Sequence, residues 1–278
     1  MKLLSFYIDD LIKTAIKEDI NYIDTSADLV LSEDDTTTAY FVAKDDGVLC
    51  GIDVALRVFE LLDKDFKATV YKKDGQYIKK GDIIADLSGH TVMLLKGERT
   101  ALNLLQHMSG IATMTDRAVK KCEGTKASVA DTRKTLPGLR SIQKYSVTVG
   151  GGRNHRYNLS DAVMLKDNHI DACGSITKAV EKVREKLGHM VKIEVETRNL
   201  SEVEEALSTG VEVIMLDNMD CETMKKAVEM TDGKALLEAS GNITDETISA
   251  VAKTGVDIIS IGALTHSVKA FDISMKIK

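Results

Sequence analysis

A run of basic residues stands out in the middle of this chain. Between Thr132 and Ser160 there are six lysine and arginine residues and no aspartate or glutamate, although the whole chain has a formal net charge of −6. The six are Arg133, Lys134, Arg140, Lys144, Arg153 and Arg156. Such a concentration of positive charge is either a solvated surface or the binding site of a negatively charged ligand. The residues that follow favour a ligand.

Acidic residues recur at constant spacing in the C-terminal half. Glu196 precedes Asp217 by 21 residues, and Asp217 precedes Glu238 by 21. Carboxylates on neighbouring strands can hold Mg²⁺, which bridges phosphate oxygens. The glycine-containing turns at 240–242 and 261–263 can offer backbone N–H groups to a phosphate. Together with the cations, this pattern predicts a Mg²⁺-dependent enzyme that acts on a phosphorylated sugar and a carboxylated partner.

The hydrophobic pattern predicts the elements that would position these residues. Six short apolar segments with polar ends alternate with amphipathic segments, and they cover residues 126–132, 161–168, 191–197, 211–218, 234–240 and 256–262. Alternating strands and helices with nearly continuous apolar strands are typical of a parallel sheet covered by helices. In a β/α barrel the polar strand ends meet at one mouth. Because six strands fall short of eight, we predict an incomplete, seven-stranded barrel over residues 111–267.

The first part of the chain has a different pattern. Residues 5–19 carry apolar side chains at helical spacing. Residues 36–52 and 67–89 are rich in β-branched and aromatic residues around turn dipeptides, which is typical of strands and hairpins. We therefore predict an α/β protein whose N-terminal part, residues 1–110, is an α+β sandwich domain.

Two further segments complete the predicted organisation. Residues 97–121 have the pattern of a long helix that is interrupted near Gly110, because glycine costs a helix roughly 1 kcal/mol relative to alanine. The last residues, 268–278, are expected to pack back on the N-terminal domain.

Composition excludes several classes of protein. The acidic balance argues against general binding to nucleic acid or to anionic membranes. No apolar stretch approaches the 18 residues of a membrane span, and Asp9 and Asp10 interrupt what would be the apolar core of a signal peptide. The four cysteines are far apart and form no CxxC pair. This usage favours reduced thiols in a cytoplasmic protein.

Seven segments of the chain resemble one family in the family's own order. They are ERTALNLLQHMSGIAT (98–113), ADTRKTLPGLR (130–140), KYSVTVGGGRNHRYNLSDAVMLKDNHI (144–170), EVE (194–196), MLDN (215–218), EASGNI (238–243) and ISIGALTHSVKAFDISMKI (259–277). The family is quinolinate phosphoribosyltransferase, also called nicotinate-nucleotide pyrophosphorylase (carboxylating). Residues 17–29 depart from its usual EDIGxGDxT because they lack the glycines.

The resemblance implies a substrate and a set of site residues. The family transfers phosphoribosyl from phosphoribosyl pyrophosphate to quinolinate and releases pyrophosphate and CO₂, which gives nicotinate mononucleotide for NAD synthesis. Residues that match the quinolinate-contacting positions are Arg99, Arg133, Lys134, His155, Arg156 and Lys166. Residues that match the phosphate-binding turns are Ser240, Gly241, Gly262 and His266. Arginine suits bidentate recognition of a carboxylate, and lysine suits contact as a point charge.

The resemblance also implies the metal, the catalytic residues and the assembly. Glu196 and Asp217 match the acidic pair near the ribose and Mg²⁺, and with Lys134 and Lys166 they are the expected catalytic residues. In the family, the residue equivalent to Arg99 reaches the active site of a partner subunit, so a homodimer is expected.

Four alternative interpretations each fit part of the sequence. A molybdenum-transport-associated relative shares DTRKT, but here the KDNH and NHR runs are complete. A transferase for nicotinate would need fewer cations. A non-catalytic sugar-phosphate-binding protein would not need the intact acidic and basic sets. Residues 74–89 are similar to the hairpins of biotinyl and lipoyl carrier modules, yet no lysine there has the flanking residues of a carrier lysine.

Overall fold

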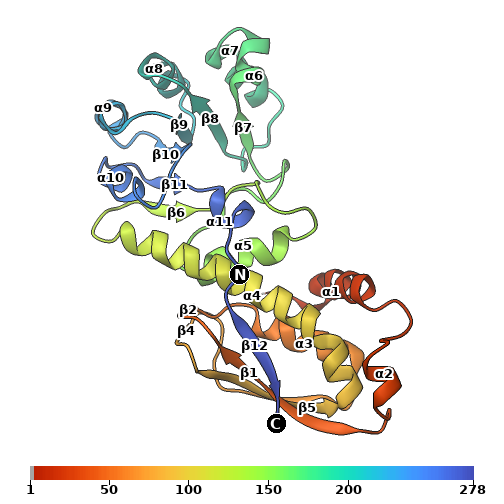
Figure 1. The fold of residues 1–278 in the computed structure, drawn as a ribbon. Helices are drawn as coiled ribbons and strands as arrows, with labels where there is room; N and C mark the ends of the chain where they lie inside the picture. Colours follow the sequence, from red (N-terminus) through yellow and green to blue (C-terminus); the bar gives the residue numbers. More distant parts are fainter. Residues whose placement is uncertain (1–2) are drawn as a thin grey trace. The chain divides into compact units, whose positions relative to one another are not determined.

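The computed structural model describes residues 3–278, which form two compact units. Of the described residues, the first unit comprises 3–116, 135–151 and 264–278, and the second comprises 117–134 and 152–263. The chain therefore leaves the second unit after Lys134, contributes one helix to the first, and returns at Gly152 (Figure 1).

Among the described residues, the first unit is built from antiparallel strands, four whole helices and parts of two more. Its helices are α1 (Ser5–Asp19), α2 (Ala27–Val30), α3 (Ile52–Leu62), most of α4 (Thr91–Lys121) and α5 (Arg140–Val149), and the short α11 (Ala263–His266) begins at its border. Its strands are β1 (Thr36–Ala43), β2 (Gly47–Val48), β3 (Lys67–Val70), β4 (Tyr77–Ile78), β5 (Ile83–His90) and β12 (Ile273–Ile277). This confirms the predicted helix at 5–19 and the predicted strands.

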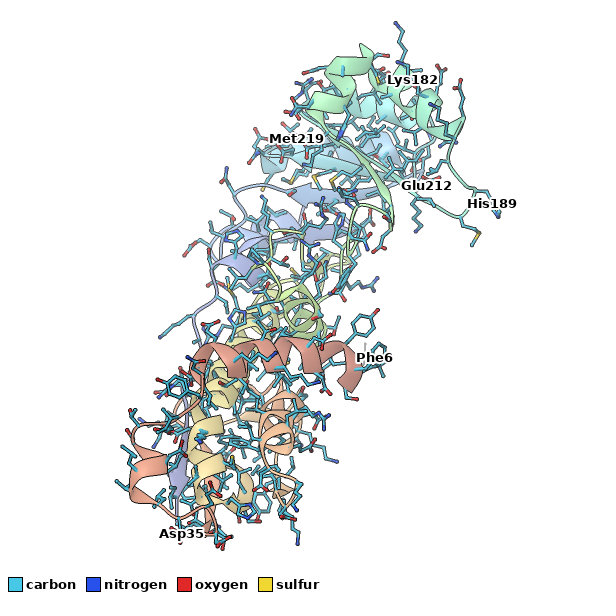
Figure 2. The ribbon with its side chains drawn as sticks, turned by 90° about the vertical axis from the view of Figure 1, so that its right-hand side faces the viewer. Phe6, Asp35, Lys182, His189, Glu212 and Met219 are labelled. Atoms are coloured by element: carbon cyan, nitrogen blue, oxygen red, sulfur yellow. The ribbon has the colours of Figure 1, made fainter. Side chains whose placement is uncertain are left out.

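The larger sheet of this unit has the strand order β12-β1-β5-β3. The last strand of the chain pairs antiparallel with β1, with Phe41 opposite Met275. Phe41 and Phe59 are fully buried beneath the sheet, where their ring centroids lie 6.2 Å apart. On α1, Ile8 and Ile12 are buried, whereas Phe6 points away from the helix into solvent (Figure 2). The buried residues of α1 thus form one apolar face, and α1 packs against α3.

Helix α4 is continuous over Thr91–Lys121, so the predicted interruption at Gly110 was wrong. Gly110 is instead needed where α4 packs closely against another backbone segment. A Cβ atom at Gly110 would lie 2.3 Å from the carbonyl oxygen of Lys269, in the segment that leads to β12. The residue allows two backbones to approach closely, which local helix propensity does not reveal.

The second unit alternates strands and helices. Its strands are β6 (Ser128–Ala130), β7 (Val163–Leu165), β8 (Ile193–Thr197), β9 (Val213–Asp217), β10 (Leu236–Ser240) and β11 (Ile258–Ser260). Its helices are α6 (Asp167–Cys173), α7 (Ile176–Arg184), α8 (Leu200–Ser208), α9 (Cys221–Thr231) and α10 (Ile248–Ala252). Each of the six predicted strand segments contains one of these strands. Side-chain caps fix where helices begin: Asn199 accepts from the N–H of Glu202, and Asp220 accepts from that of Thr223.

The six strands form one parallel sheet in the order β6-β11-β10-β9-β8-β7. The backbone of Arg153 bonds to Val129 and Asp131 on the edge of β6 that faces away from β11. This single-residue parallel bridge stands where the seventh strand of the predicted barrel would lie. Among the described residues the ladders do not close a ring, and the α/β class with a parallel, helix-covered sheet is confirmed.

Alternation along the strands separates the core from the site. Val195, Leu216 and Ala239 are fully buried, and they alternate with the polar residues of the same strands. Residue pairing brings the polar set into register, because Ser240 lies opposite Asp217 in the ladder between β10 and β9. Over residues 3–278, no helix is both long and apolar enough to cross a membrane.

Candidate active site

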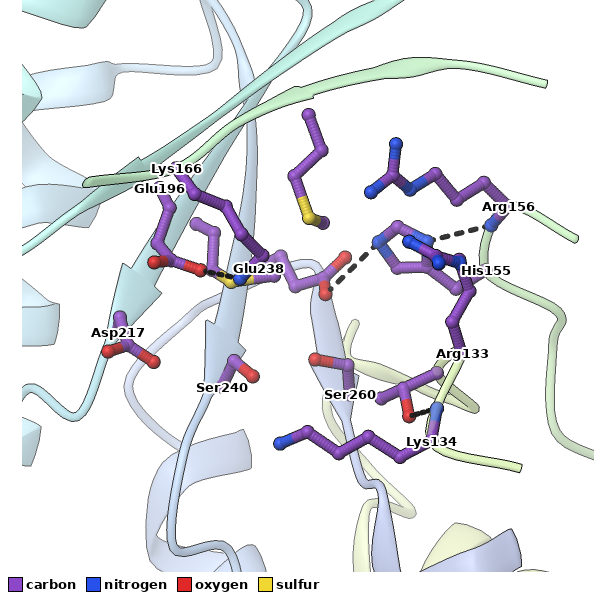
Figure 3. A pocket seen from close by; sticks show the side chains of 13 residues that line it. Arg133, Lys134, His155, Arg156, Lys166, Glu196, Asp217, Glu238, Ser240 and Ser260 are labelled. Atoms are coloured by element: carbon purple, nitrogen blue, oxygen red, sulfur yellow. Dashed lines mark hydrogen bonds and ion pairs between the residues drawn. The ribbon is translucent and has the colours of Figure 1, made fainter. Parts of the chain in front are cut away.

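A cavity of about 330 Å³ lies at the carboxyl ends of the parallel strands of the second unit (Figure 3). Eight of the residues predicted for the site line it: Arg133, Lys134, His155, Arg156, Lys166, Glu196, Asp217 and Ser240. Side chains that are separated by up to 107 positions in the sequence thus meet at one mouth. Four cations and three carboxylates, those of Glu196, Asp217 and Glu238, in one small pocket are a set suited to a polyanionic ligand together with a cation.

The other four predicted residues lie elsewhere. Gly241 and Gly262 belong to the turns that follow β10 and β11. Arg99 is exposed on α4, and His266 is exposed at the end of α11, where its Nδ1 lies 2.6 Å from the hydroxyl of Ser267. Arg99 and His266 both belong to the first unit, and their predicted contacts with substrate stay predictions.

Asp131 organises the loop that carries His155 and Arg156. The carboxylate is fully buried at the end of β6, where it accepts hydrogen bonds from the side-chain amide of Asn154 and, at 2.9 Å, from the backbone N–H of His155. Arg156 donates to the carbonyl of Ala162 at 3.0 Å. Burial, followed by the charge of Arg133, lowers the pKa of Arg156. The two guanidinium groups therefore repel each other, and an anion between them would relieve that repulsion.

Lys166 and Glu196 form an ion pair across the mouth. Lys166 stands between the end of β7 and the start of α6, and its backbone N–H donates to Nδ1 of His169 at 3.0 Å. Glu196 projects from the neighbouring strand β8, with its side chain 12% exposed. An anionic ligand can share Lys166 with this carboxylate, because an ammonium group has three donors.

The turns after β9 and β10 are held together by asparagine side chains. Asn218 donates to the carboxylate of Asp217 at 2.9 Å, and Asn242 donates to the side-chain carbonyl of Asn218 at 3.0 Å. Both asparagines and Gly241 have positive φ. A Cβ atom at Gly241 would lie 2.2 Å from Oδ1 of Asn218. This position therefore requires glycine both for its positive φ and for its close contact with Asn218.

His155 lies against two buried carboxylates at the floor of the cavity. Its Nε2 is 3.0 Å from Glu194 and 3.5 Å from Glu238 (Figure 3 shows the contact with Glu238). Its Nδ1 accepts the backbone N–H of Arg156 at 2.7 Å. Both ring nitrogens are thus engaged inside the protein. Sequence reasoning noted Glu194 and Glu238 but did not select them, although strand alternation places Glu194 on the same face as Glu196, and Glu238 on the same face as Ser240.

Two groups of described residues in and next to this cavity could hold a metal ion. Glu196 and Asp217 present carboxylates from adjacent strands to the cavity, and carboxylate oxygens are what Mg²⁺ prefers. The ligand atoms of His155, Glu194 and Glu238 lie within 4.8 Å of one another. However, the ring nitrogen that faces the two carboxylates carries the hydrogen, since the other one accepts. The second group is therefore a hydrogen-bonded cluster, and the first fits Mg²⁺ better.

A parallel sheet with a mouth lined by cations and carboxylates is the arrangement of an α/β enzyme that binds a polyanionic substrate at the strand ends. The family described as quinolinate phosphoribosyl transferase, C-terminal domain, matches residues 111–276, and the family of the corresponding N-terminal domain matches residues 24–109. The chain belongs to the quinolinate phosphoribosyltransferase family. It is thus a transferase of nicotinate nucleotide biosynthesis.

Individual relatives agree over nearly the whole chain. A protein of Bacillus subtilis (strain 168) named probable nicotinate-nucleotide pyrophosphorylase [carboxylating] is 46% identical over 94% of this chain and 90% of its own length. The chloroplastic nicotinate-nucleotide pyrophosphorylase [carboxylating] of Arabidopsis thaliana is 44% identical over 96% of this chain and 81% of its own. The crystal structure of NadC from Streptococcus pyogenes superposes with a TM-score of 0.96 at 44% identity, covering 99% of this chain and 98% of that one.

Proposed function

We propose that this chain transfers phosphoribosyl from phosphoribosyl pyrophosphate to quinolinate, with loss of the 2-carboxylate as CO₂. The products are nicotinate mononucleotide, pyrophosphate and CO₂. The observation that carries this proposal is the meeting of four cations with Glu196 and Asp217 in one cavity at the strand ends. The arrangement matches a dicarboxylate at one side of the cavity and a sugar phosphate at the other.

The quinolinate end is assigned to the cations. Arg133 and Arg156 bind carboxylates in bidentate fashion, and Lys134 and Lys166 add point charges. Because Lys166 is already paired with Glu196, it links the two ends of the cavity. His155 forms part of the wall, and its ring holds the backbone at Arg156.

The phosphoribosyl end is assigned to the acidic pair and the turns. Ser240, Gly241, Gly262 and His266 receive phosphate oxygens. Glu196 and Asp217 would hold Mg²⁺, which when bound neutralises and orients the pyrophosphate. The same carboxylates stabilise positive charge that develops on the ribose.

The bond changes follow from charge. The ring nitrogen of quinolinate attacks the anomeric carbon while the bond from that carbon to pyrophosphate breaks. The product is a pyridinium, and its positive nitrogen stabilises the electron pair that the departing 2-carboxylate leaves on C2, where a proton then adds. Lys134 and Lys166 balance the negative charge that moves during these steps. A covalent intermediate with the enzyme is not required.

Arg133 offers the sharpest test of the assignment. Arg133→Ala should abolish quinolinate binding and leave the affinity for phosphoribosyl pyrophosphate largely intact, as measured by calorimetry. Arg198→Ala is the matched control, because this arginine is paired with Glu202 on the surface and lies outside the cavity. An equal loss of both ligands in Arg133→Ala would remove the assignment.

The proposal includes a cytoplasmic homodimer in which Arg99 completes the partner's site. Mixing Arg99→Ala with Arg156→Ala subunits should then restore activity, up to about a quarter of the wild-type sites at random assortment. Mixing Arg133→Ala with Arg156→Ala is the matched control, since each site then lacks one arginine of its own subunit. Failure of the first mixture to recover activity would contradict a shared site.

A further inference from the structure

The buried carboxylates of Glu194 and Glu238 have no assigned purpose in the reaction described so far. Glu194 is 5% exposed and Glu238 is 2% exposed, and they come from β8 and β10. In the described part of the chain, Oε1 of each has no hydrogen-bond partner. Burying ionised carboxylates without full hydrogen bonding is costly, so a protein retains them where they do something.

The tautomer of the His155 ring limits the hydrogen bonds that these two carboxylates can accept. Because Nδ1 accepts the N–H of Arg156, the neutral ring has one hydrogen, and that hydrogen is on Nε2. Nε2 donates to Glu194 at 3.0 Å and stands 3.5 Å from Glu238. A single N–H cannot satisfy two carboxylates. Two acids that face the same donor in a buried place are stable when one of them carries a proton.

The surroundings place that proton on Glu238. Burial, and then the charge of Glu194, raise the pKa of Glu238 to about 7. Asp131, directly after β6, acts in the same direction, whereas His155 and the hydroxyl of Ser260 on β11 oppose it. At neutral pH this side chain is therefore a carboxylic acid in a large fraction of molecules.

Glu238 also stands between two cavities of the second unit. One is the catalytic cavity. The other, of about 380 Å³, is lined by residues at the starts of the strands, such as Val213, Leu236 and Ile258. Glu238 and His155 line both, and Glu194 lines only the second. An acid in this position can meet a ligand on one side and solvent protons on the other.

We propose that Glu238 is a catalytic acid that supplies the proton replacing the lost 2-carboxylate, and that the second cavity reprotonates it. The inference rests on the proposed function. When CO₂ leaves, the electron pair of the broken C2–carboxylate bond stays on C2. The O–H of Glu238 gives its proton to C2, a C–H bond forms, and Glu238 becomes a carboxylate. A proton from water in the second cavity restores the acid, and Glu194 keeps it in place.

Glu238→Gln tests this step, because glutamine keeps the shape and has no acidic proton. We expect kcat to fall about 10²-fold, the size typical of a lost general acid, with a smaller change in KM for quinolinate. The wild-type kcat should decline as pH rises through the pKa of Glu238, and this decline should be absent from the variant. Glu202→Gln, outside both cavities, is the control and should resemble the wild type.

A second measurement separates proton transfer from structural damage. Product formed in an equal mixture of H₂O and D₂O carries a ratio of hydrogen to deuterium at C2 that reports the donor. This ratio should change in Glu238→Gln, where water must donate directly. If this variant does not fold, Glu194→Gln serves, because removing the neighbouring charge should move the decline of kcat to lower pH. An isotope ratio that is unchanged in Glu238→Gln would overturn the proposal. So would a decline of kcat with pH that persists in Glu238→Gln, or one that stays at the same pH in Glu194→Gln. A wild type that forms no product from quinolinate would instead overturn the proposed function.

Discussion

The cost of burying Glu238 leads to a stability prediction that is independent of catalysis. An ordinary glutamate has a pKa of 4.5, and burial with the charge of Glu194 raises the pKa of Glu238 to about 7. Between these values the folded protein binds more protons than the unfolded chain, so the free energy of unfolding falls as pH rises. At ~1.4 kcal/mol per pH unit, the ionised side chain costs the folded state about 3 kcal/mol above pH 7.

Glu238→Gln should remove this cost at high pH and leave stability almost unchanged at low pH. The glutamine is neutral at every pH, and its amide can donate to Glu194. Relative to wild type, we expect an increase in Tm of roughly 6–12 °C at pH 8, since 1 kcal/mol shifts a domain of this size by about 2–4 °C. At pH 5, where wild-type Glu238 is protonated, the two proteins should melt close together.

Thermal unfolding at pH 5 and pH 8 measures the effect. Glu202→Gln is the control of opposite sign: burial alone would raise the pKa of Glu202, but hydrogen bonds from Arg198 outweigh it and lower that pKa. That substitution should give no stabilisation at pH 8. If Glu238→Gln shifts Tm equally at both pH values, or lowers it at pH 8, then Glu238 is not a strained acid and the reasoning fails. A variant that is more stable and less active is what a strained catalytic group predicts.

Three further predictions concern other parts of the chain. Asp63 accepts the backbone N–H of His90 at 2.8 Å. Burial would raise the pKa of Asp63, but this and other hydrogen bonds lower it. Asp63→Asn should therefore destabilise the fold by roughly 1–3 kcal/mol at pH 7, as measured by urea unfolding. The loss should shrink as pH falls through the lowered pKa, and a constant difference would contradict it. Gly241→Ala should raise KM for phosphoribosyl pyrophosphate because the added Cβ displaces Asn218. Gly174→Ala is the control and should leave this KM unchanged, because Gly174 has a φ of 89° and open space around it. If both substitutions raise KM equally, the turn at Gly241 is not part of the site. Chelating divalent cations should stop turnover in a product assay and Mg²⁺ should restore it, and activity that survives chelation would exclude the metal.

Much of the fold follows from sequence pattern because the parallel strands are short, apolar and evenly spaced. All six predicted strand segments contain strands, and the polar residues at their ends gather at one cavity. The break expected at Gly110 does not occur, since the reason for that glycine is the backbone of Lys269, which is distant in sequence. Local propensity carries no information about such a contact.

The sequence predicted the cations of the site, but it predicted only some of its acidic residues. Arg133 and Lys166 could be found from charge and from the resemblance to a family. Glu194 and Glu238 could have been found by extending the alternation of strand faces one step into the sheet. Their pairing with His155 could not, because it depends on a ring nitrogen occupied by the backbone of the next residue.

The central claim is that the cation-rich cavity selects a pyridine dicarboxylate for phosphoribosyl transfer. An assay of the purified protein with quinolinate, phosphoribosyl pyrophosphate and Mg²⁺, with nicotinate in place of quinolinate as the control, tests it most directly. We predict equal amounts of nicotinate mononucleotide, pyrophosphate and CO₂ from quinolinate, and no mononucleotide from nicotinate. No turnover of quinolinate, or equal turnover of nicotinate, would contradict the account.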